Sequence, residues 1–118
     1  MYRFEELKIW QKAMNIIEEV YLLSAEFPQE EKFGLKSQIR RSAVSIASNI
    51  AEGAGRNTNG EFRNFLSVAS GSSNELYTQL ILAYRLKLVK QARVQNILTH
   101  VKEVQKMNYS LIKSLNNN

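Results

Sequence analysis

The sequence predicts an all-α protein, built as an antiparallel up-down-up-down bundle of four helices. The chain has one Pro and five Gly in 118 residues and is rich in helix-favouring side chains, so it has few places where a helix must end. Apolar residues recur every three or four positions between short connectors, which is typical of helices that pack side by side. We expect one domain spanning residues 1–118, because a chain of this length buries about two-thirds of its unfolded surface around a single core.

The first helix is expected at about residues 5–26. Its apolar stripe at helical spacing consists of Ile9, Ala13, Ile16, Ile17, Val20 and Leu23. Pro28 ends the helix, because the residue before a proline, here Phe27, is pushed out of the α region. A short connector then leads to the second helix.

The second helix is expected at about residues 35–53. Its apolar positions step by four, four, three and four residues, at Leu35, Ile39, Ala43, Ile46 and Ile50. The opposite side carries a polar row of Arg41, Ser45, Ser48 and Glu52, with Asn49 at its edge. Gly53 is expected to end the helix in the left-handed conformation. Small side chains in this stretch allow another backbone to come close on more than one side.

The third helix is expected at about residues 59–86, after a loop that is rich in Gly and Asn. Thr58 and Glu61 have the spacing of a capping box. Gly71 leaves two alternatives, a break followed by a new cap or one continuous helix. A seven-residue recurrence crosses Gly71 and favours one helix, through Phe62, Ala69, Leu76 and Ala83. Gly71 costs about 1 kcal/mol relative to Ala, and a close crossing with the second helix is expected to offset this cost.

The fourth helix is expected at about residues 92–115 and has the cleanest heptad pattern. Val94, Val101, Asn108 and Leu115 recur every seven residues. Asn108 therefore falls at a core position, where a polar residue can fix the register or the number of partners. The alternative is that Asn108 lies at the helix edge with its amide in water.

The formal net charge is +5, and it is unevenly distributed. Residues 1–31 carry −4 and the remaining residues carry +9. A basic surface is suited to a nucleic acid or an acidic protein, because phosphate contacts supply the sequence-independent part of nucleic-acid affinity. The alternative is that these charges are solvated or are neutralised within the chain, as where Glu26, Glu30 and Glu31 share an end of the bundle with Lys87, Lys90 and Arg93.

The composition argues against an enzyme and against a bound cofactor. The chain has no Cys, no Asp and a single histidine, His100, so it lacks the residues for a Ser-His-Asp triad or a thiolate metal site. A cluster of Glu52, Glu61 and Glu75 is the one metal site that the sequence allows, and it lacks the Glu-x-x-His pattern of di-iron bundles. The absence of Cys, of a signal peptide and of a membrane-spanning segment leads us to expect a cytoplasmic protein that does not enter a membrane.

Several motifs in the first three helices together resemble one known family. They are Phe4, Leu7, Trp10, Gln11 and Ala13; Phe27-Pro28, Glu31, Gly34-Leu35 and Gln38; Arg40-Arg41, Ala43, Ser45-Ile46, Asn49 to Gly53 and Arg56; and Glu61-Phe62, Phe65-Leu66, Ala69, Gly71-Ser72, Glu75-Leu76 and Thr78 to Leu80. This set resembles the four-helix bundle family of the 23S rRNA intervening sequence proteins. The resemblance implies assembly into a ring, a homopentamer, as in the related accessory proteins of diversity-generating retroelements. Those relatives are thought to engage nucleic acid and a reverse transcriptase.

Two functions of different classes follow from these observations. The first is an RNA- or DNA-binding oligomer whose candidate phosphate contacts are Arg40, Arg41, Arg56, Arg63, Lys102 and Lys106. The second is a protein-protein assembly module, in which Arg40, Arg41 and Glu52 make ion pairs within or between subunits. The candidate packing and interface residues are Ser45, Asn49, Glu52, Gly53, Gly71, Glu75 and Asn108.

Overall fold

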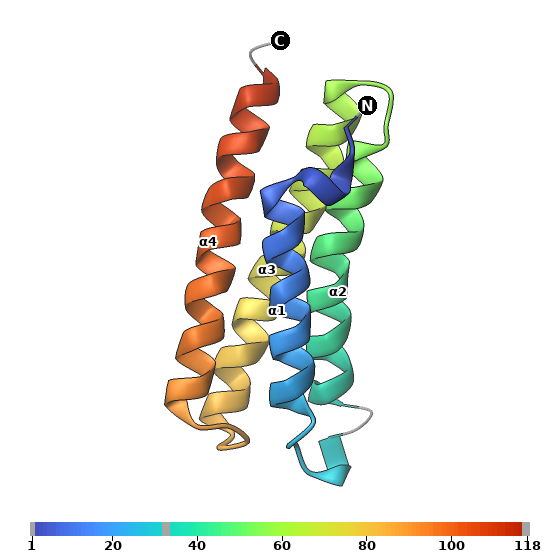
Figure 1. Ribbon diagram of the computed structural model, residues 1–118. Coiled ribbons are helices and arrows are strands. Elements are labelled where there is room, and N and C mark those ends of the chain that lie inside the picture. The colour runs from blue at the N-terminus through green and yellow to red at the C-terminus, as the bar shows by residue number, and fades with distance from the viewer. Residues whose placement is uncertain (1, 32–33, 117–118) are drawn as a thin grey trace.

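The computed structural model describes residues 2–31 and 34–116, and these residues form four α-helices and no β-strand. The helices are α1 (Lys8–Ser24), α2 (Leu35–Ala54), α3 (Asn59–Arg85) and α4 (Gln91–Asn116). Two short 3-10 helices, η1 (Phe4–Glu6) and η2 (Gln29–Glu31), precede α1 and α2. The α1–α2 and α3–α4 connections lie at one end of the molecule, and the α2–α3 connection and both termini lie at the other (Figure 1).

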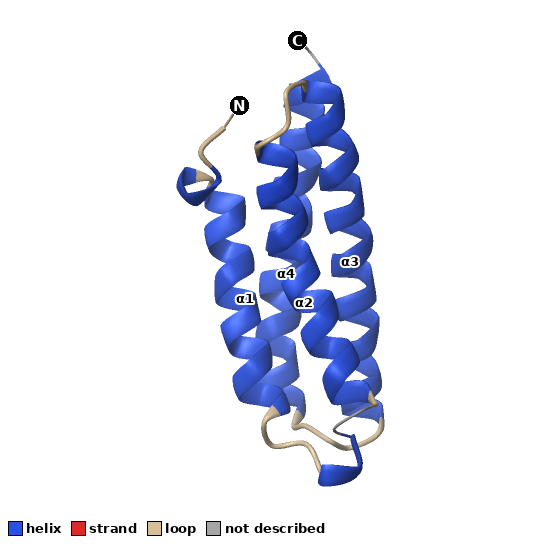
Figure 2. Cartoon of the chain, turned by 90° about the vertical axis from the view of Figure 1, so that its right-hand side faces the viewer, coloured by secondary structure: helices blue, strands red, loops and turns tan. Residues whose placement is uncertain are grey.

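The helices lie side by side in an elongated body that measures 47 × 23 × 20 Å (Figure 2). Helix α2 packs against α1 and α3, and α4 packs against α3 and α1. Every helix contributes to one continuous apolar core, whose largest fully buried side chains include Ile16, Ile46, Phe62, Leu80 and Val101. This packing is that of a four-helix bundle, as the apolar spacing predicts. None of the helices in the described ranges is long and apolar enough to cross a membrane.

The first helix begins later than its sequence pattern predicts, at Lys8 instead of Glu5. Leu7 is extended, with φ −76° and ψ 123°, and it separates α1 from η1. The break lets the preceding segment fold back over the bundle. The Phe4 ring packs edge-on against Trp10 at 5.2 Å between ring centroids, and the amide of Tyr2 donates to the Ala54 carbonyl.

Gly53 does not end the second helix, contrary to the sequence prediction. Helix α2 continues through Ala54, and no described glycine has a positive φ. Gly53 is instead buried where α2 meets α3. A Cβ atom at this position would lie 2.7 Å from the Phe65 Cβ and 2.9 Å from a ring carbon of Phe62. The glycine therefore serves close packing and not chain reversal.

The third helix runs without a break through Gly71, as the seven-residue recurrence predicts. Its start is also confirmed, because the Thr58 hydroxyl accepts a hydrogen bond from the Glu61 amide at 3.1 Å. In a capping box the Glu61 carboxylate would accept a hydrogen bond from the amide of Thr58. Here it accepts from the amide of Asn57, one residue earlier in the chain. The expected close crossing at Gly71 is wrong, because Gly71 is exposed and a Cβ built there would have nothing within 4 Å outside its own helix.

Helix α3 ends at Arg85, and two residues later Lys87 is in the left-handed conformation, with φ 62°. The Lys87 amide donates to the Tyr84 carbonyl at 2.9 Å, and the Leu88 amide donates to the Ala83 carbonyl at 3.0 Å. These two hydrogen bonds form a Schellman motif, which usually has glycine at the left-handed position. A lysine there pays the steric cost of a Cβ that lies too close to the backbone.

Replacing Lys87 by glycine should raise the free energy of unfolding by about 1 kcal/mol, because the left-handed conformation costs glycine no steric strain. Urea unfolding followed by circular dichroism measures the change. The matched control is Lys90→Gly, which removes the same charge from the same connector at a residue that does not have a positive φ. Equal stabilities for the two variants would contradict the assignment of strain to Lys87.

Candidate nucleic-acid interface

Two of the predicted phosphate contacts, Arg40 and Arg56, are engaged within the protein. The Arg40 Nε donates to the Ser24 hydroxyl at 2.8 Å, and its guanidinium lies 4.3 Å from the centroid of the Tyr21 ring. This residue therefore ties α2 to α1. Arg56 pairs with the Glu52 carboxylate at 2.7 Å and lies over the Phe65 ring.

Arg63 is also held by a partner in the same chain. Its Nη1 donates at 2.9 Å to the carbonyl of Leu115, which lies in the last turn of α4. Carbonyls in this last turn have no helical partner, so Arg63 fixes the end of α4 against α3. Its guanidinium is partly buried in this contact, which leaves it less free to bind a phosphate than a side chain in open water.

Arg41 and Lys106 are the two predicted cations that make no hydrogen bond, ion pair or aromatic-ring contact with any described residue. They lie on different helices, and both are exposed. The remaining candidate, Lys102, places its ammonium 5.5 Å from the centroid of the Tyr77 ring on α3. The structure thus does not gather the candidate cations into one patch.

A basic surface that the sequence reasoning only half identified lies on α4. We call it the lysine face and define it as Lys102, Lys106, Tyr109 and Lys113. These residues follow one another at steps of four, three and four, so they share one side of the helix and cover about 16 Å of its length. All four are exposed, and Tyr109 is 69% exposed. The helical spacing was available in the sequence and could have added Tyr109 and Lys113 to the candidates.

Two adjoining hollows border the lysine face. The first has a volume of about 470 Å³ and is lined by Lys102, Gln105, Lys106, Tyr109 and Ser110. The second has a volume of about 380 Å³ and lies between α3 and α4, lined by Tyr77, Gln95, Leu98, Thr99, Lys102, Glu103 and Lys106. The two share Lys102 and Lys106, and each hollow is also lined by one tyrosine, Tyr109 in the first and Tyr77 in the second.

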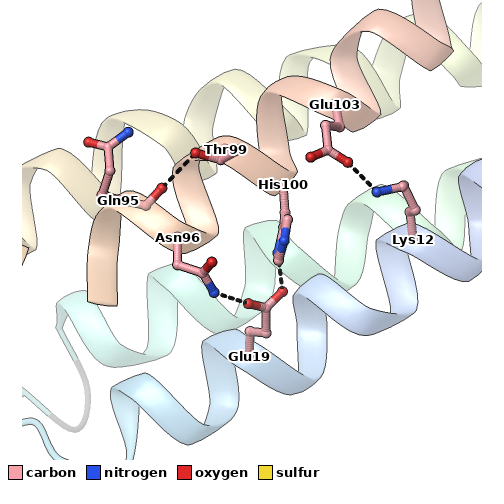
Figure 3. Close-up of polar contacts among 7 residues, drawn as sticks. All are labelled: Lys12, Glu19, Gln95, Asn96, Thr99, His100 and Glu103. Carbon is pink, nitrogen blue, oxygen red and sulfur yellow. Dashed lines mark hydrogen bonds and ion pairs between the residues drawn. The ribbon is translucent and has the colours of Figure 1, made fainter. Parts of the chain in front are cut away.

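Among the residues that the structure describes, Glu103 is the only acidic one that lines either hollow. The Lys12 ammonium on α1 donates a hydrogen bond to the Glu103 carboxylate, and this contact lowers the pKa of Glu103 against a smaller opposing effect of burial (Figure 3). The charges of His100 and Lys106 lower it further. The carboxylate is therefore ionised at neutral pH and turned toward α1, where its charge is balanced.

The seam between α1 and α4 is a series of such polar contacts. Glu19 accepts a hydrogen bond from the Asn96 amide at 3.1 Å, and its other oxygen lies 2.7 Å from the His100 Nδ1 (Figure 3). Arg93 pairs with Glu26, as the charges at this end of the bundle predict. The partners are Lys12 and Glu19 on α1 and Glu26 two residues past its end, each seven residues from the next. His100 is thus part of a helix-helix contact at the boundary of the bundle.

The small polar residues of α2 and α3 do face one another, as expected, but around Ser72 and not around Gly71. The hydroxyls of Ser45 and Ser72 lie 2.8 Å apart, and Asn49 donates to both the carbonyl and the hydroxyl of Ser45. Ser42 donates to the Gln79 side chain at 2.7 Å. The hydrogen bonds of Ser42 and Ser45 therefore connect α2 to α3.

Asn108 lies in the core, and the alternative of a helix edge with its amide in water is wrong. The residue is 3% exposed, and its Nδ2 donates at 2.8 Å to the Leu66 carbonyl on α3. Its Oδ1 is buried and accepts no hydrogen bond from the described residues. A buried amide oxygen without a hydrogen-bond donor lowers the free energy of unfolding, because the oxygen loses its hydrogen bonds to water when the chain folds.

The acidic residues do not form a metal cluster. Glu52 is occupied by Arg56, Glu61 caps the start of α3, and Glu75 is exposed without an ion-pair partner in the described ranges. Among residues 2–31 and 34–116, no three His, Cys, Asp or Glu side chains lie close enough together to hold a metal ion. The carboxylate site that the sequence allowed is therefore not assembled there.

The fold and the arrangement of these residues define the class as a small helical-bundle protein. The chain belongs to the 23S rRNA-intervening sequence protein family, whose model matches residues 5–110. This match confirms the family resemblance of the sequence motifs.

The fold is similar to that of a solved relative. This relative is a protein with unknown function, from the S23 ribosomal protein family and from Bacteroides thetaiotaomicron, and its crystal structure matches with a TM-score of 0.83 and 25% sequence identity. The match covers 89% of this chain and 98% of the relative. Among curated proteins, none matches the chain.

Proposed function

We propose that the chain is a non-enzymatic, oligomeric protein that binds RNA through the basic surface of α4. The lysine face is the observation that carries this proposal. Its three lysines make no ion pair with any described residue, whereas Arg40, Arg56 and Arg63 are held by contacts within the chain. Ammonium groups that are free of carboxylate partners are the ones that can replace the counterions of a phosphate backbone.

The test is RNA binding at two salt concentrations, followed by the anisotropy of a labelled strand. Three phosphate contacts on a single strand predict that the logarithm of the binding constant falls with the logarithm of salt concentration with a slope of about −2. Affinity should therefore fall by more than tenfold between about 50 and 200 mM salt. The absence of binding at the lower salt, or binding that does not respond to salt, would refute the proposal.

We also propose that the bundle is antiparallel, up-down-up-down, and that it assembles into a ring-shaped homo-oligomer, a pentamer by its family resemblance. The seam between α1 and α4 supports the antiparallel arrangement, because Lys12 pairs with Glu103 and Glu26 pairs with Arg93, so numbers rise along one helix as they fall along the other. A ring would repeat the lysine face around its axis and raise the avidity for a long nucleic acid.

A second candidate function is an assembly module without direct nucleic-acid contact. It is favoured by exposed side chains on α2 and α3. The apolar side chains of Val68 and Leu82 on α3, and of Leu86 at its C-terminal cap, are 43–53% exposed. Arg41 and Glu75, both exposed, lie on these same two helices. Exposed apolar side chains beside unpaired charges of both signs are typical of a surface that a protein partner covers.

Replacing Arg41 by Glu should lower the oligomer mass measured by light scattering, because it puts a second negative charge on the surface that carries Glu75. The matched control is Lys8→Glu, which makes the same change of charge at an exposed position near the start of α1. An unchanged mass for the Arg41 variant would show that this surface is not the one through which copies of the chain associate.

A further inference from the structure

Tyr109 is an exposed aromatic side chain that does not contribute to the core of the bundle. It is 69% exposed, against 42% or less for the other exposed tyrosines, Tyr2, Tyr21 and Tyr84. The Tyr2 ring packs against the Phe62 ring, and the Tyr21 ring packs against the Arg40 guanidinium. No described residue packs a ring or a cation against Tyr109 in the same way.

The surroundings of Tyr109 are suited to a flat, polar, negatively charged ligand. Tyr109 lines the hollow of about 470 Å³ together with Lys102, Lys106 and Gln105. Lys113 follows one helical turn further on. The second hollow, between α3 and α4, shares the same two lysines and is also lined by Tyr77, whose ring lies 5.5 Å from the Lys102 ammonium. We call the two hollows together the α3–α4 groove.

We propose that this groove binds a single strand of nucleic acid, with an unpaired base stacked on Tyr109 and with Lys102, Lys106 and Lys113 on the phosphates. The inference rests on the proposed function and adds the form of the ligand. Stacking on an exposed ring needs a free base face, which a single strand offers and a duplex does not. A lysine row by itself would bind both forms, so Tyr109 is the residue that distinguishes them.

Charge complementarity supports this occupant over an acidic protein segment. The lysines are spread over about 16 Å along one side of α4, which matches a ligand that carries its charges in a row along an extended backbone. The one carboxylate in the groove, that of Glu103, is neutralised by Lys12 from α1. A ring that stacks on bases adds nothing to the binding of a chain of carboxylates.

The experiment compares the full-length protein and its Tyr109→Ala variant against a uridine strand of about ten nucleotides and against a duplex of the same length. Removing the ring should weaken binding of the single strand by about five- to a hundredfold and leave its salt slope unchanged. Duplex binding should stay within about twofold. Tyr109→Phe should restore single-strand affinity, because stacking needs the ring and not the hydroxyl.

Matched variants separate the ring from the charges. Lys106→Gln should reduce the salt slope by about 0.7, the value of one phosphate contact on a single strand. Tyr84→Ala removes an exposed tyrosine at the other end of α3, and Lys8→Gln removes a charge from α1, so neither should change affinity or slope appreciably. Circular dichroism of each variant verifies that the helices are intact.

The outcomes distinguish this inference from the proposed function. If the wild-type protein binds neither nucleic acid at low salt, the proposed function fails. If it binds with the expected slope but Tyr109→Ala binds the single strand as well as the wild type does, only the inference fails. Equal displacement by polyglutamate and by an unlabelled strand of the same charge would also overturn it. Equal binding of a thymidine strand and the uridine strand would support it, since the base face is common to both.

Discussion

Replacing Gly53 by alanine is expected to lower the free energy of unfolding by about 1 to 3 kcal/mol, although alanine is the better helix former by about 1 kcal/mol. The reason is the close approach of α2 to α3. The added methyl would lie 2.7 Å from the Phe65 Cβ and 3.2 Å from the Phe62 carbonyl oxygen. The Phe65 Cβ is fixed to the backbone of α3, so the helix itself has to move.

Gly71→Ala is the matched control, because it makes the same substitution at a second glycine inside a helix. A Cβ there meets nothing within 4 Å, so only the gain in helix propensity remains. This variant should be more stable than the wild type by about 0.5 to 1 kcal/mol. Urea unfolding of both variants measures the difference. A Gly53 variant as stable as the Gly71 variant would show that the two helices are not in close contact.

The two glycines also show what the sequence could and could not predict. Periodicity predicted correctly that α3 continues through Gly71, because the pattern of its own apolar residues crosses that position. Whether a glycine is needed depends on how near the next helix lies, which is a property of two elements and not of one. The sequence therefore located the packing of small residues in the right pair of helices, but of its two candidate glycines only Gly53 lies in close contact with the neighbouring helix.

Some helix ends could be predicted from the sequence, and others could not. The start of α3 was predictable, because Thr58 and Glu61 form a local cap within four residues. The late start of α1 was not, since it depends on contacts that the segment makes with the far end of α2, as between Tyr2 and Ala54. The sequence therefore predicts a helix end that is capped by residues close to it in the chain, but not one that depends on contacts with another helix.

The candidate site was predictable only as a charge balance. Arg40 looks like a free cation in the sequence, yet it meets Ser24, sixteen residues earlier, and Arg63 meets Leu115, fifty-two residues later. Contacts between residues far apart in the sequence engage these arginines within the protein, and the composition does not reveal such contacts. The lysine face, by contrast, lies on one helix, so its spacing could have been read from the sequence alone.

Asn108 carries the second large prediction. Replacing it by leucine should raise the free energy of unfolding by about 1 to 3 kcal/mol, because the change removes a buried oxygen that has no donor in the described structure and adds apolar surface of similar volume. The Leu66 carbonyl, which now accepts from Asn108, lies inside α3 and keeps its helical hydrogen bond.

Asn108→Asp keeps the size of the side chain and should have the opposite effect, a loss of about 3 kcal/mol or more at neutral pH. The aspartate would have no N–H to donate to the Leu66 carbonyl and would bring a charge into a site that is 3% exposed. Urea unfolding of the wild type and both variants gives the two differences. Their opposite signs are the expected result.

The mass of the leucine variant then bears on why an asparagine stands at this position. A polar residue in a helical core can lower stability while it fixes one register or one number of partners. If Asn108 has this role, the leucine variant should be more stable and yet show a broader distribution of masses by light scattering. A variant that is more stable with an unchanged single mass would mean that Asn108 does not select the assembly. A less stable variant would mean that the Oδ1 atom has a hydrogen-bond donor in the assembled protein.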